Sequence, residues 1–159
     1  MEETLELLKK LNIAFELYEH EAVFTNIDSG KVAIAQVAEN AKNLFLRAEK
    51  THQFYLLTID HGKKADLKAF AKTVGEKGFS FGKPEELLEH LKLTPGSVSP
   101  LGLMNDAGCH VKYYIDEDLL KKGKIYVHPN INTATVGITA EDLIKFLRHT
   151  GHELHTVQI

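Results

Sequence analysis

The stretch KNLFLR, from Lys42 to Arg47, has the alternation of a β-strand. Successive side chains of a strand point to opposite faces of its sheet. One face holds Lys42, Leu44 and Leu46, and the other holds Asn43, Phe45 and Arg47. A segment fit for the protein interior therefore begins with an ammonium group and an amide. A second strand is expected from Gln53 to Asp60, and the polar residues between the two predict a hairpin.

Helices and further strands are interspersed along the rest of the chain. Amphipathic or capped segments predict four helices: Thr4 to Leu11, Asp66 to Val74, a segment opened by Pro84, and a segment capped by Thr139 and ended by Gly151. A further short helix is expected from Lys31 to Ala38. The other expected strands are Ala14 to Tyr18, Phe79 to Phe81, His110 to Ile115, Lys124 to His128, Thr133 to Ile138 and Glu153 to Gln158. This order, without a strict βαβ period, predicts a mixed α+β (α/β) fold with a mixed sheet flanked by helices. The length of 159 residues predicts one domain spanning residues 1–159.

The composition is that of an ordinary globular protein. The chain is 43% hydrophobic and carries a net charge of −3, so no global positive field attracts nucleic acid. Lysines do gather locally, and a solvated surface is the default interpretation of such groups. The single cysteine, Cys109, forms no internal disulfide, which fits a reducing compartment. The acidic N-terminus is not a signal peptide and no apolar run is long enough to span a membrane, so we expect a soluble cytoplasmic protein.

Several kinds of chemistry receive no support from the motifs. The nine histidines include no HExxH pair, and His149, His152 and His155 span a helix end, a glycine and a strand. We therefore expect solvated or capping histidines and no metal. Cys109 has no well-placed base, and GxSxG, P-loop and GxGxxG motifs are absent from the sequence. No covalent hydrolase site and no nucleotide cofactor are predicted.

Three features remain as candidates for a functional site. They are Lys42-Asn43 at a strand start, the GxxxP loop from Gly96 to Pro100, and His128-Pro129-Asn130 at a strand end. Each has an ordinary structural interpretation: a rim lysine that reaches water, a connector, and a turn with an incidental histidine. The loop could also present N–H groups and hydroxyls to a developing oxyanion. Spacing alone does not show that the three features converge.

Taken together, the motifs resemble those of one known family. They are EHEAVFT (Glu19 to Thr25), KNLFLR (Lys42 to Arg47), DLKAFAK (Asp66 to Lys72), PGSVSPLGL (Pro95 to Leu103), Asn105-Asp106 and HPNINTATVGI (His128 to Ile138), in the family's order. The sequence is similar to the YbaK/prolyl-tRNA editing-domain family over nearly its whole length. KNLFLR and PGSVSP most resemble the free-standing Ala-tRNA(Pro) deacylase branch.

This resemblance implies a fold and an activity. The fold would be a curved, partly barrel-like mixed sheet with helices around it. The activity would be hydrolysis of the ester that joins a wrong amino acid to tRNA(Pro), because a proline site cannot reject a slightly smaller apolar side chain well by binding alone. Water would attack with help from the terminal ribose hydroxyl, without a protein nucleophile, metal or cofactor. The partner would be the acceptor end of tRNA(Pro), with prolyl-tRNA synthetase a candidate transient partner.

The resemblance also implies roles for particular residues. Lys42 would contact the terminal adenosine or its phosphate, Asn43 would position the aminoacyl group, Gly96 and its loop would bind the carbonyl side, and His128 would shape the pocket near the ester. The catalytic set would thus be Lys42, Gly96 and His128. The substrate-binding set would be Asn43, Phe24, Thr25, Leu44, Ser97, Ser99, Pro100 and Asn105. Leu44 and Leu46 would pack below the aminoacyl pocket, and Phe45 would anchor the strand to a helix.

The chain departs from the family pattern after Thr25. Asn26-Ile27-Asp28-Ser29 stands where the family usually has Val-Glu-Glu-Ala, so the preferred amino acid stays open. Alternatives to an Ala-tRNA(Pro) deacylase are a deacylase for Cys-tRNA(Pro) or another small amino acid, and a non-catalytic aminoacyl-tRNA-binding module. A hydrolase of free small esters is a weaker alternative.

Overall fold

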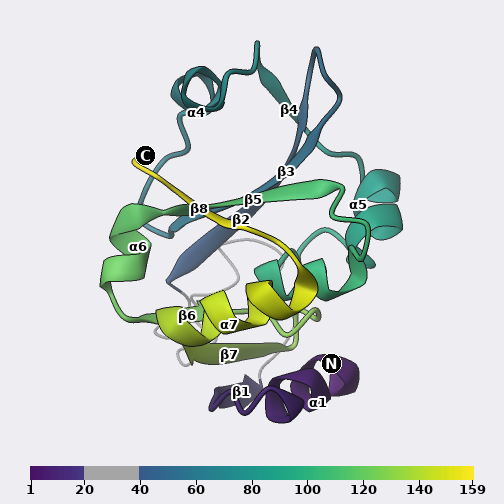
Figure 1. Cartoon of the computed structure of the whole chain (residues 1–159), viewed down its shortest axis with the longest axis vertical. Helices are drawn as coiled ribbons and strands as arrows, with labels where there is room; N and C mark the ends of the chain where they lie inside the picture. Colours follow the sequence, from purple (N-terminus) through teal and green to yellow (C-terminus); the bar gives the residue numbers. More distant parts are fainter. Residues whose placement is uncertain (20–39) are drawn as a thin grey trace.

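The computed structural model describes residues 1–19 and 40–159. Its helices are α1 (Glu2–Lys10), α4 (Leu67–Val74), α5 (Pro84–Leu91), α6 (Glu117–Lys121) and α7 (Ala140–Thr150), with a 3-10 helix η1 (Pro100–Asn105). Its strands are β1 (Glu16–Glu19), β2 (Ala41–Ala48), β3 (Phe54–Asp60), β4 (Phe79–Phe81), β5 (Val111–Asp116), β6 (Lys124–Val127), β7 (Ala134–Thr139) and β8 (Leu154–Val157). In Figure 1, α4 and β4 lie at one end of the molecule, and α1 and β1 lie at the other.

The strands form two sheets, which confirms the predicted mixed α+β class. One sheet has the order β4-β2-β3-β5-β8, and the other has the order β1-β7-β6. β2 pairs with β3 and β4 in antiparallel fashion, whereas β5 runs parallel to both β3 and β8, so the larger sheet is mixed. The smaller sheet is antiparallel. The described strands therefore lie in two separate sheets and do not close into a barrel.

Each face of the larger sheet covers its own hydrophobic core. Side chains of one face, among them Phe45, Leu56 and Tyr113, join the larger core, which also contains residues of α5, α7, β6 and β7. Leu46, Leu57 and Phe70 belong to a smaller core on the other face, under α4. The alternation of KNLFLR thus divides β2 between two interiors, because successive side chains enter different cores.

The predicted helix signals act as expected at two helices. The Asp66 side chain accepts a hydrogen bond from the Ala69 N–H at the start of α4, and the Thr139 hydroxyl accepts one from the Asp142 N–H at the start of α7. Gly75 and Gly151 end these helices with φ of 79° and 85°, a conformation that glycine adopts without a steric cost. These caps satisfy main-chain groups that each helix end leaves without an internal partner.

The amide of Asn40 joins the two sheets just before β2. Its Nδ2 donates to the Lys124 carbonyl oxygen at 2.9 Å, and its Oδ1 accepts from the Tyr126 N–H at 3.0 Å. β6 is an edge strand of the smaller sheet, so this side chain pairs main-chain groups that β7 does not reach. The start of β2 is thereby fixed beside β6.

Some predictions made from the sequence need correction or fall outside the described residues. The sequence reading missed α6, and it assigned no helix to η1, which follows the predicted loop. The predicted helix from Lys31 to Ala38 lies outside the described residues. The suggestion that Leu44 and Leu46 pack beneath the pocket was wrong, because both leucines belong with the smaller core on the opposite face.

Candidate active site

A small cavity of about 160 Å³ lies at the start of β2. The described residues that line it are Ala41, Lys42, Asn43, His61, Gly96, Val98 and His128. The three features singled out in the sequence therefore meet here: the start of β2, the GxxxP loop and the end of β6. The site contains one ammonium group, one amide and two imidazoles around a narrow space.

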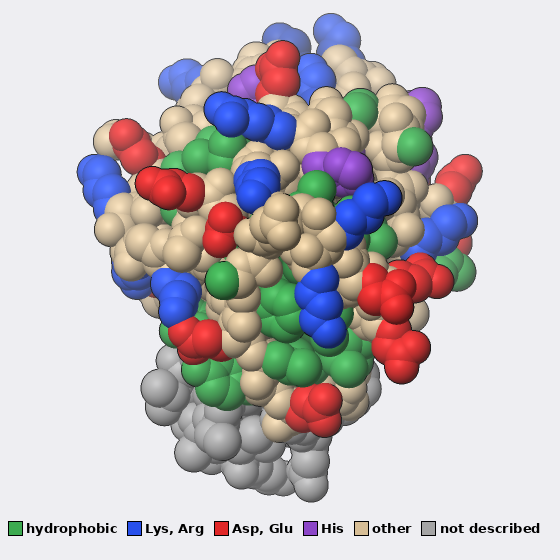
Figure 2. Space-filling model, turned by 60° about the horizontal axis from the view of Figure 1, so that its bottom comes forward, with side chains coloured by type: hydrophobic (Ala, Val, Ile, Leu, Met, Phe, Trp, Pro, Cys, Tyr) green, Lys and Arg blue, Asp and Glu red, His purple; other side chains and the backbone are tan. Residues whose placement is uncertain are grey.

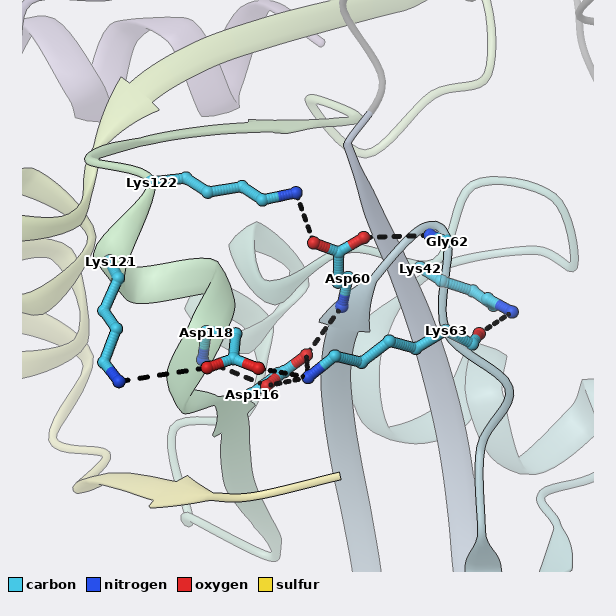
Figure 3. A network of polar contacts seen from close by, with 8 residues as sticks. All are labelled: Lys42, Asp60, Gly62, Lys63, Asp116, Asp118, Lys121 and Lys122. Atoms are coloured by element: carbon cyan, nitrogen blue, oxygen red, sulfur yellow. Dashed lines mark hydrogen bonds and ion pairs between the residues drawn. The ribbon is translucent and has the colours of Figure 1, made fainter.

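The ammonium of Lys42 is held by main chain. Its Nζ donates to the carbonyl oxygen of Lys63 at 2.7 Å. Lys63 follows the turn that ends β3, where the Gly62 N–H donates to Asp60 Oδ1 at 2.9 Å. Figure 3 shows Lys42 and Lys63 meeting at this carbonyl, while the side chain of Lys63 extends the other way. The position of the Lys42 charge thus depends on the turn from Asp60 to Lys63.

That turn is fixed by the buried carboxylate of Asp116 at the end of β5. Asp116 accepts from the Asp60 N–H at 3.1 Å, from the Asp118 N–H at 3.1 Å, and from Lys63 Nζ at 3.0 Å. Lys63 Nζ also contacts Asp118 at 2.7 Å, as Figure 3 shows. A buried carboxylate needs such partners, since an unpaired buried charge is costly.

Three other members of this network, Asp60, Lys63 and Asp118, have shifted pKa values. The ammonium of Lys122 and then the Gly62 N–H hold the pKa of Asp60 below its ordinary value. Lys63 likewise lowers the pKa of Asp118, and Asp118 raises the pKa of Lys63. A depressed carboxyl pKa stabilises the fold above the ordinary carboxyl range, and this contribution is lost as the pH falls through the folded-state value. The turn is therefore held by these contacts at neutral pH.

Asn43 enters the cavity from the opposite face of β2. Its Oδ1 accepts a hydrogen bond from the Thr58 hydroxyl at 2.6 Å. Thr58 is the residue paired with Asn43 across the β2–β3 ladder, so the contact follows from the register. The carbonyl oxygen of the amide is thereby engaged by the protein.

His128 contributes an imidazole whose tautomer the fold defines. Its Nδ1 lies 2.9 Å from the Ala134 carbonyl oxygen. A carbonyl only accepts hydrogen bonds, so Nδ1 carries the proton and Nε2 is the basic nitrogen of the neutral ring. Asn130 in the same motif donates to the Thr4 hydroxyl at 2.9 Å, which joins this turn to α1. The HPN motif thus combines a cavity residue with a structural one.

Only some residues of the GxxxP loop line the cavity. Gly96 and Val98 line it, and Gly96 has a φ of 92°, a conformation that residues with a side chain rarely adopt. The Ser97 hydroxyl instead donates to the Thr94 carbonyl oxygen at 2.9 Å, and the Ser99 hydroxyl accepts from the Leu101 N–H at 3.2 Å. Pro100 is buried as the first residue of η1. Ser97, Ser99 and Pro100 therefore build the loop, and the structure does not place them on the cavity wall.

Other predicted substrate-binding residues lie elsewhere. Asn105 is exposed and donates to the Leu91 carbonyl oxygen at the end of α5. Leu44 packs with the smaller core. Phe24 and Thr25, together with the departure from Asn26 to Ser29, lie outside the described residues.

The Asn105-Asp106 motif is explained by the neighbouring aspartate. Buried Asp106 accepts from the His110 and Val111 N–H groups and pairs with His152 Nε2 at 2.9 Å. The expectation of a solvated or capping His152 is wrong, since only 6% of this residue is exposed. The pair fixes the start of β5 against the end of α7.

Three wall residues were not predicted from the sequence: Ala41, His61 and Val98. Ala41 directly precedes Lys42 on the alternate face, and Val98 lies inside the GxxxP loop, so both could have been found by extending the motifs. His61 gave no local signal. It reaches the cavity because its N–H donates to the Asn40 carbonyl oxygen at 2.9 Å, which brings the β3 turn beside the start of β2.

Two larger hollows lie away from Lys42-Asn43, the GxxxP loop and His128. One, of about 460 Å³, is formed by residues of α4 and β4 and by Glu49. The other, of about 510 Å³, lies between the end of α7 and β8. In the first, the Glu76 carboxylate already accepts from the Thr51 and Tyr55 hydroxyls. We assign the site to the smaller cavity because the three candidate features, Lys42-Asn43, the GxxxP loop and His128, meet there.

Surface charge, possible metal ligands and helix length are three further features of the described residues. On the face in Figure 2, basic and acidic side chains are interspersed rather than separated into fields of one sign. Among residues 1–19 and 40–159, no three histidine, cysteine or acidic side chains are grouped to hold a metal ion. None of the helices that the structure describes is long and apolar enough to cross a membrane. On the face in Figure 2, any attraction for a polyanion would therefore come from individual basic side chains.

Comparison with known proteins identifies the family. Residues 20–146 match the model of the aminoacyl-tRNA editing domain. The prolyl-tRNA editing protein ProX of Acetoanaerobium sticklandii is 38% identical over 152 residues, covering 96% of this chain and 93% of that protein. The prolyl-tRNA synthetase associated domain-containing protein 1 of Bos taurus is 35% identical over 150 residues, covering 92% and 87% of the two chains. The chain belongs to the aminoacyl-tRNA editing domain family.

A solved structure supports the fold. It belongs to a candidate trans-editing enzyme for prolyl tRNA synthetase and has a TM-score of 0.72 and 22% sequence identity. The match covers 99% of this chain and 96% of the other, so the two proteins share the same overall fold. β8 lies beyond the residues matched by the family model but completes the five-stranded sheet.

Two carboxylates that share Lys63 allow a matched stability test. The side chain of Asp116 is fully buried, whereas that of Asp118 is 58% exposed. Asp116→Ala should lower the free energy of unfolding by about 3 kcal/mol, because two N–H groups and an ammonium lose a buried acceptor. Asp118→Ala should lower it far less, because solvent screens the exposed ion pair between Asp118 and Lys63. Urea unfolding measures both, and equal losses would contradict the role given to Asp116.

Proposed function

We propose that the protein is a trans-editing hydrolase that cleaves the aminoacyl ester of mischarged tRNA(Pro), with Ala-tRNA(Pro) as its substrate. The observation that carries the proposal is the convergence of Lys42, Asn43, Gly96 and His128 on one small cavity. These residues come from distant parts of the chain, and each belongs to a motif that the family resemblance assigned to the aminoacylated end of the tRNA. The relative named as a prolyl-tRNA editing protein supports the same substrate class.

The reaction needs no covalent enzyme intermediate. A water oxygen attacks the ester carbonyl carbon, the bond from that carbon to the ribose oxygen breaks, and the ribose oxygen takes up a proton. The products are the free amino acid and tRNA with an intact terminal ribose. The neighbouring ribose hydroxyl assists by hydrogen bonding to the water. The described wall residues include no serine, cysteine or threonine, which fits direct attack by water.

The wall residues suit distinct tasks in this reaction. The Lys42 ammonium binds a phosphate oxygen of the terminal adenosine, and Asn43 positions the aminoacyl group. Gly96 gives the substrate access to main chain on the carbonyl side. His128 closes the pocket near the ester, with its basic Nε2 set by the Nδ1 contact to Ala134.

The size of the cavity favours a small amino acid. Its volume of about 160 Å³ is below the roughly 300 Å³ at which drug-sized ligand pockets begin. An alanyl group needs little space, whereas the terminal adenosine would lie outside. A second site that admits only a small amino acid would remove the alanine that a synthetase attaches when alanine enters its proline site.

The proposal also covers domain, partners and location. Residues 1–159 would act as one editing domain, because β8 pairs with β5 in the same sheet as β2, which carries Lys42 and Asn43. The partner is the acceptor end of tRNA(Pro), and transient association with prolyl-tRNA synthetase would present the substrate. A cytoplasmic location follows, since charged tRNA serves translation there.

A deacylation panel tests the proposed activity. Ala-tRNA(Pro), Cys-tRNA(Pro) and Pro-tRNA(Pro) are each incubated with the protein, and loss of the labelled amino acid is followed. Ala-tRNA(Pro) should be hydrolysed fastest and Pro-tRNA(Pro) spared. Faster loss of cysteine would move the chain to the Cys-tRNA(Pro) alternative. Binding of tRNA without hydrolysis of any substrate would refute the enzyme and favour a binding module.

Lys42 provides the sharpest single-residue test. Lys42→Ala should lower kcat/KM by roughly 100-fold or more, because truncating a desolvated charge contact typically costs 2–5 kcal/mol. The fold should survive, since the Lys42 side chain donates to one main-chain carbonyl. Lys64→Ala removes a nearby exposed lysine and is the matched control. Near-wild-type turnover of Lys42→Ala, or an equal loss in Lys64→Ala, would refute the assigned role.

A further inference from the structure

Two hydroxyl groups and one amide form a hydrogen-bonded series that leads from the core of the larger sheet to the cavity. The Tyr113 hydroxyl donates to Thr58 Oγ1 at 2.8 Å, and the Thr58 hydroxyl donates to Asn43 Oδ1 at 2.6 Å. Tyr113 and Thr58 are 1% and 0% exposed, so no bulk water competes for these bonds. Neither residue lines the cavity that Asn43 lines.

Which group donates in each of these hydrogen bonds follows from the number of protons available. Burial raises the pKa of Tyr113 above its ordinary value, so the phenol stays protonated at neutral pH and needs an acceptor. Thr58 Oγ1 is that acceptor, which leaves the single Thr58 proton to be donated to Asn43. If the Asn43 amide were rotated by 180°, its Nδ2 would donate to Thr58 and the Thr58 proton would lose its acceptor.

The distance between Thr58 and Asn43 supports the same direction. O–H···O bonds have their most common length near 2.7–2.8 Å, whereas N–H···O bonds centre near 2.9–3.0 Å. The observed 2.6 Å is the length expected of a hydroxyl that donates to the amide oxygen. The two arguments are independent, and both engage Oδ1 inside the protein.

We propose that Thr58 and Tyr113 are positioning residues that fix the Asn43 amide, so that its Nδ2 faces the cavity and acts only as a hydrogen-bond donor to the substrate. This inference rests on the proposed function and assigns Asn43 a defined chemical role in it. A fixed N–H donor suits the ester carbonyl oxygen, which gains negative charge as water attacks. A donor held in advance needs no reorientation during the reaction, whereas a freely rotating amide would present its oxygen part of the time.

Two substitutions at Thr58 separate hydrogen bonding from packing. Thr58→Val keeps the shape and removes the hydroxyl, whereas Thr58→Ser keeps the hydroxyl and removes a methyl group. In single-turnover deacylation of Ala-tRNA(Pro), Thr58→Val should slow the chemical step about tenfold, less than the 100-fold or more seen when an oxyanion donor is lost outright. Its tRNA Kd should change less than about twofold, and Thr58→Ser should restore most of the rate. A packing role predicts the reverse order, with serine the worse variant.

A double-mutant cycle asks whether Thr58 acts through Asn43. In an Asn43→Ala background, Thr58→Val should cause no further loss of rate, because the amide that it orients is gone. Tyr113→Phe should give a smaller loss than Thr58→Val, and this too should vanish in that background. Full losses that persist without Asn43, measured on variants shown to be folded by circular dichroism, would overturn the proposal.

The orientation can also be tested without substrate. The side-chain amide signals of Asn43, identified by their absence in Asn43→Ala, should be a sharp pair in the ¹⁵N–¹H NMR spectrum of the wild type and of Thr58→Ser. They should broaden or shift in Thr58→Val. Unchanged signals in Thr58→Val would overturn the fixed amide. Lack of deacylation by the wild type would instead refute the proposed function, so the two failures are distinguishable.

Discussion

The pairing register of β2 with β3 is the constraint on which the site depends. It places Lys42 opposite Ile59 and Asn43 opposite Thr58. Because side chains alternate between faces, a slip of one residue would exchange the faces of every side chain in β2. In the observed register, Asn43 reaches the cavity beside the larger core and meets the Thr58 hydroxyl. Lys42 points to the other side and reaches the turn that follows β3.

The same register explains how a lysine, Lys42, can lie near the start of the largely buried strand β2. Lys42 lies at the sheet end, where the Lys63 carbonyl accepts its hydrogen bond, so the charge needs no place in the core. The buried Asp116 carboxylate holds the turn that supplies this carbonyl. Asn40 then fixes the start of β2 against β6, which brings His128 to the same cavity. A protein of net charge −3 can thus present one well-placed cation to a polyanionic ligand.

Local patterns predicted much of the fold but only part of the site. Alternation and capping residues gave most strands and the helices α1, α4, α5 and α7, because these signals act over a few residues. They missed α6, which has only five residues. The positions of residues in the sequence did not show that Gly96 lines the cavity while Ser97, Ser99 and Asn105 do not. A residue of a motif can stabilise a loop without facing the cavity beside it. His61 and the Thr58–Tyr113 pair depend on contacts between strands and had no local signal.

The central claim is that the cavity at the start of β2 receives the aminoacyl group. The most direct measurement is an NMR titration with an adenosine that carries alanine through a stable 3′-amide bond in place of the ester. The account predicts that the largest shifts fall on Asn43, Gly96, Val98 and His128, including the side-chain amide of Asn43. Shifts centred instead on Lys68, Lys72 and Phe79 around the larger hollow of α4 and β4 would contradict it.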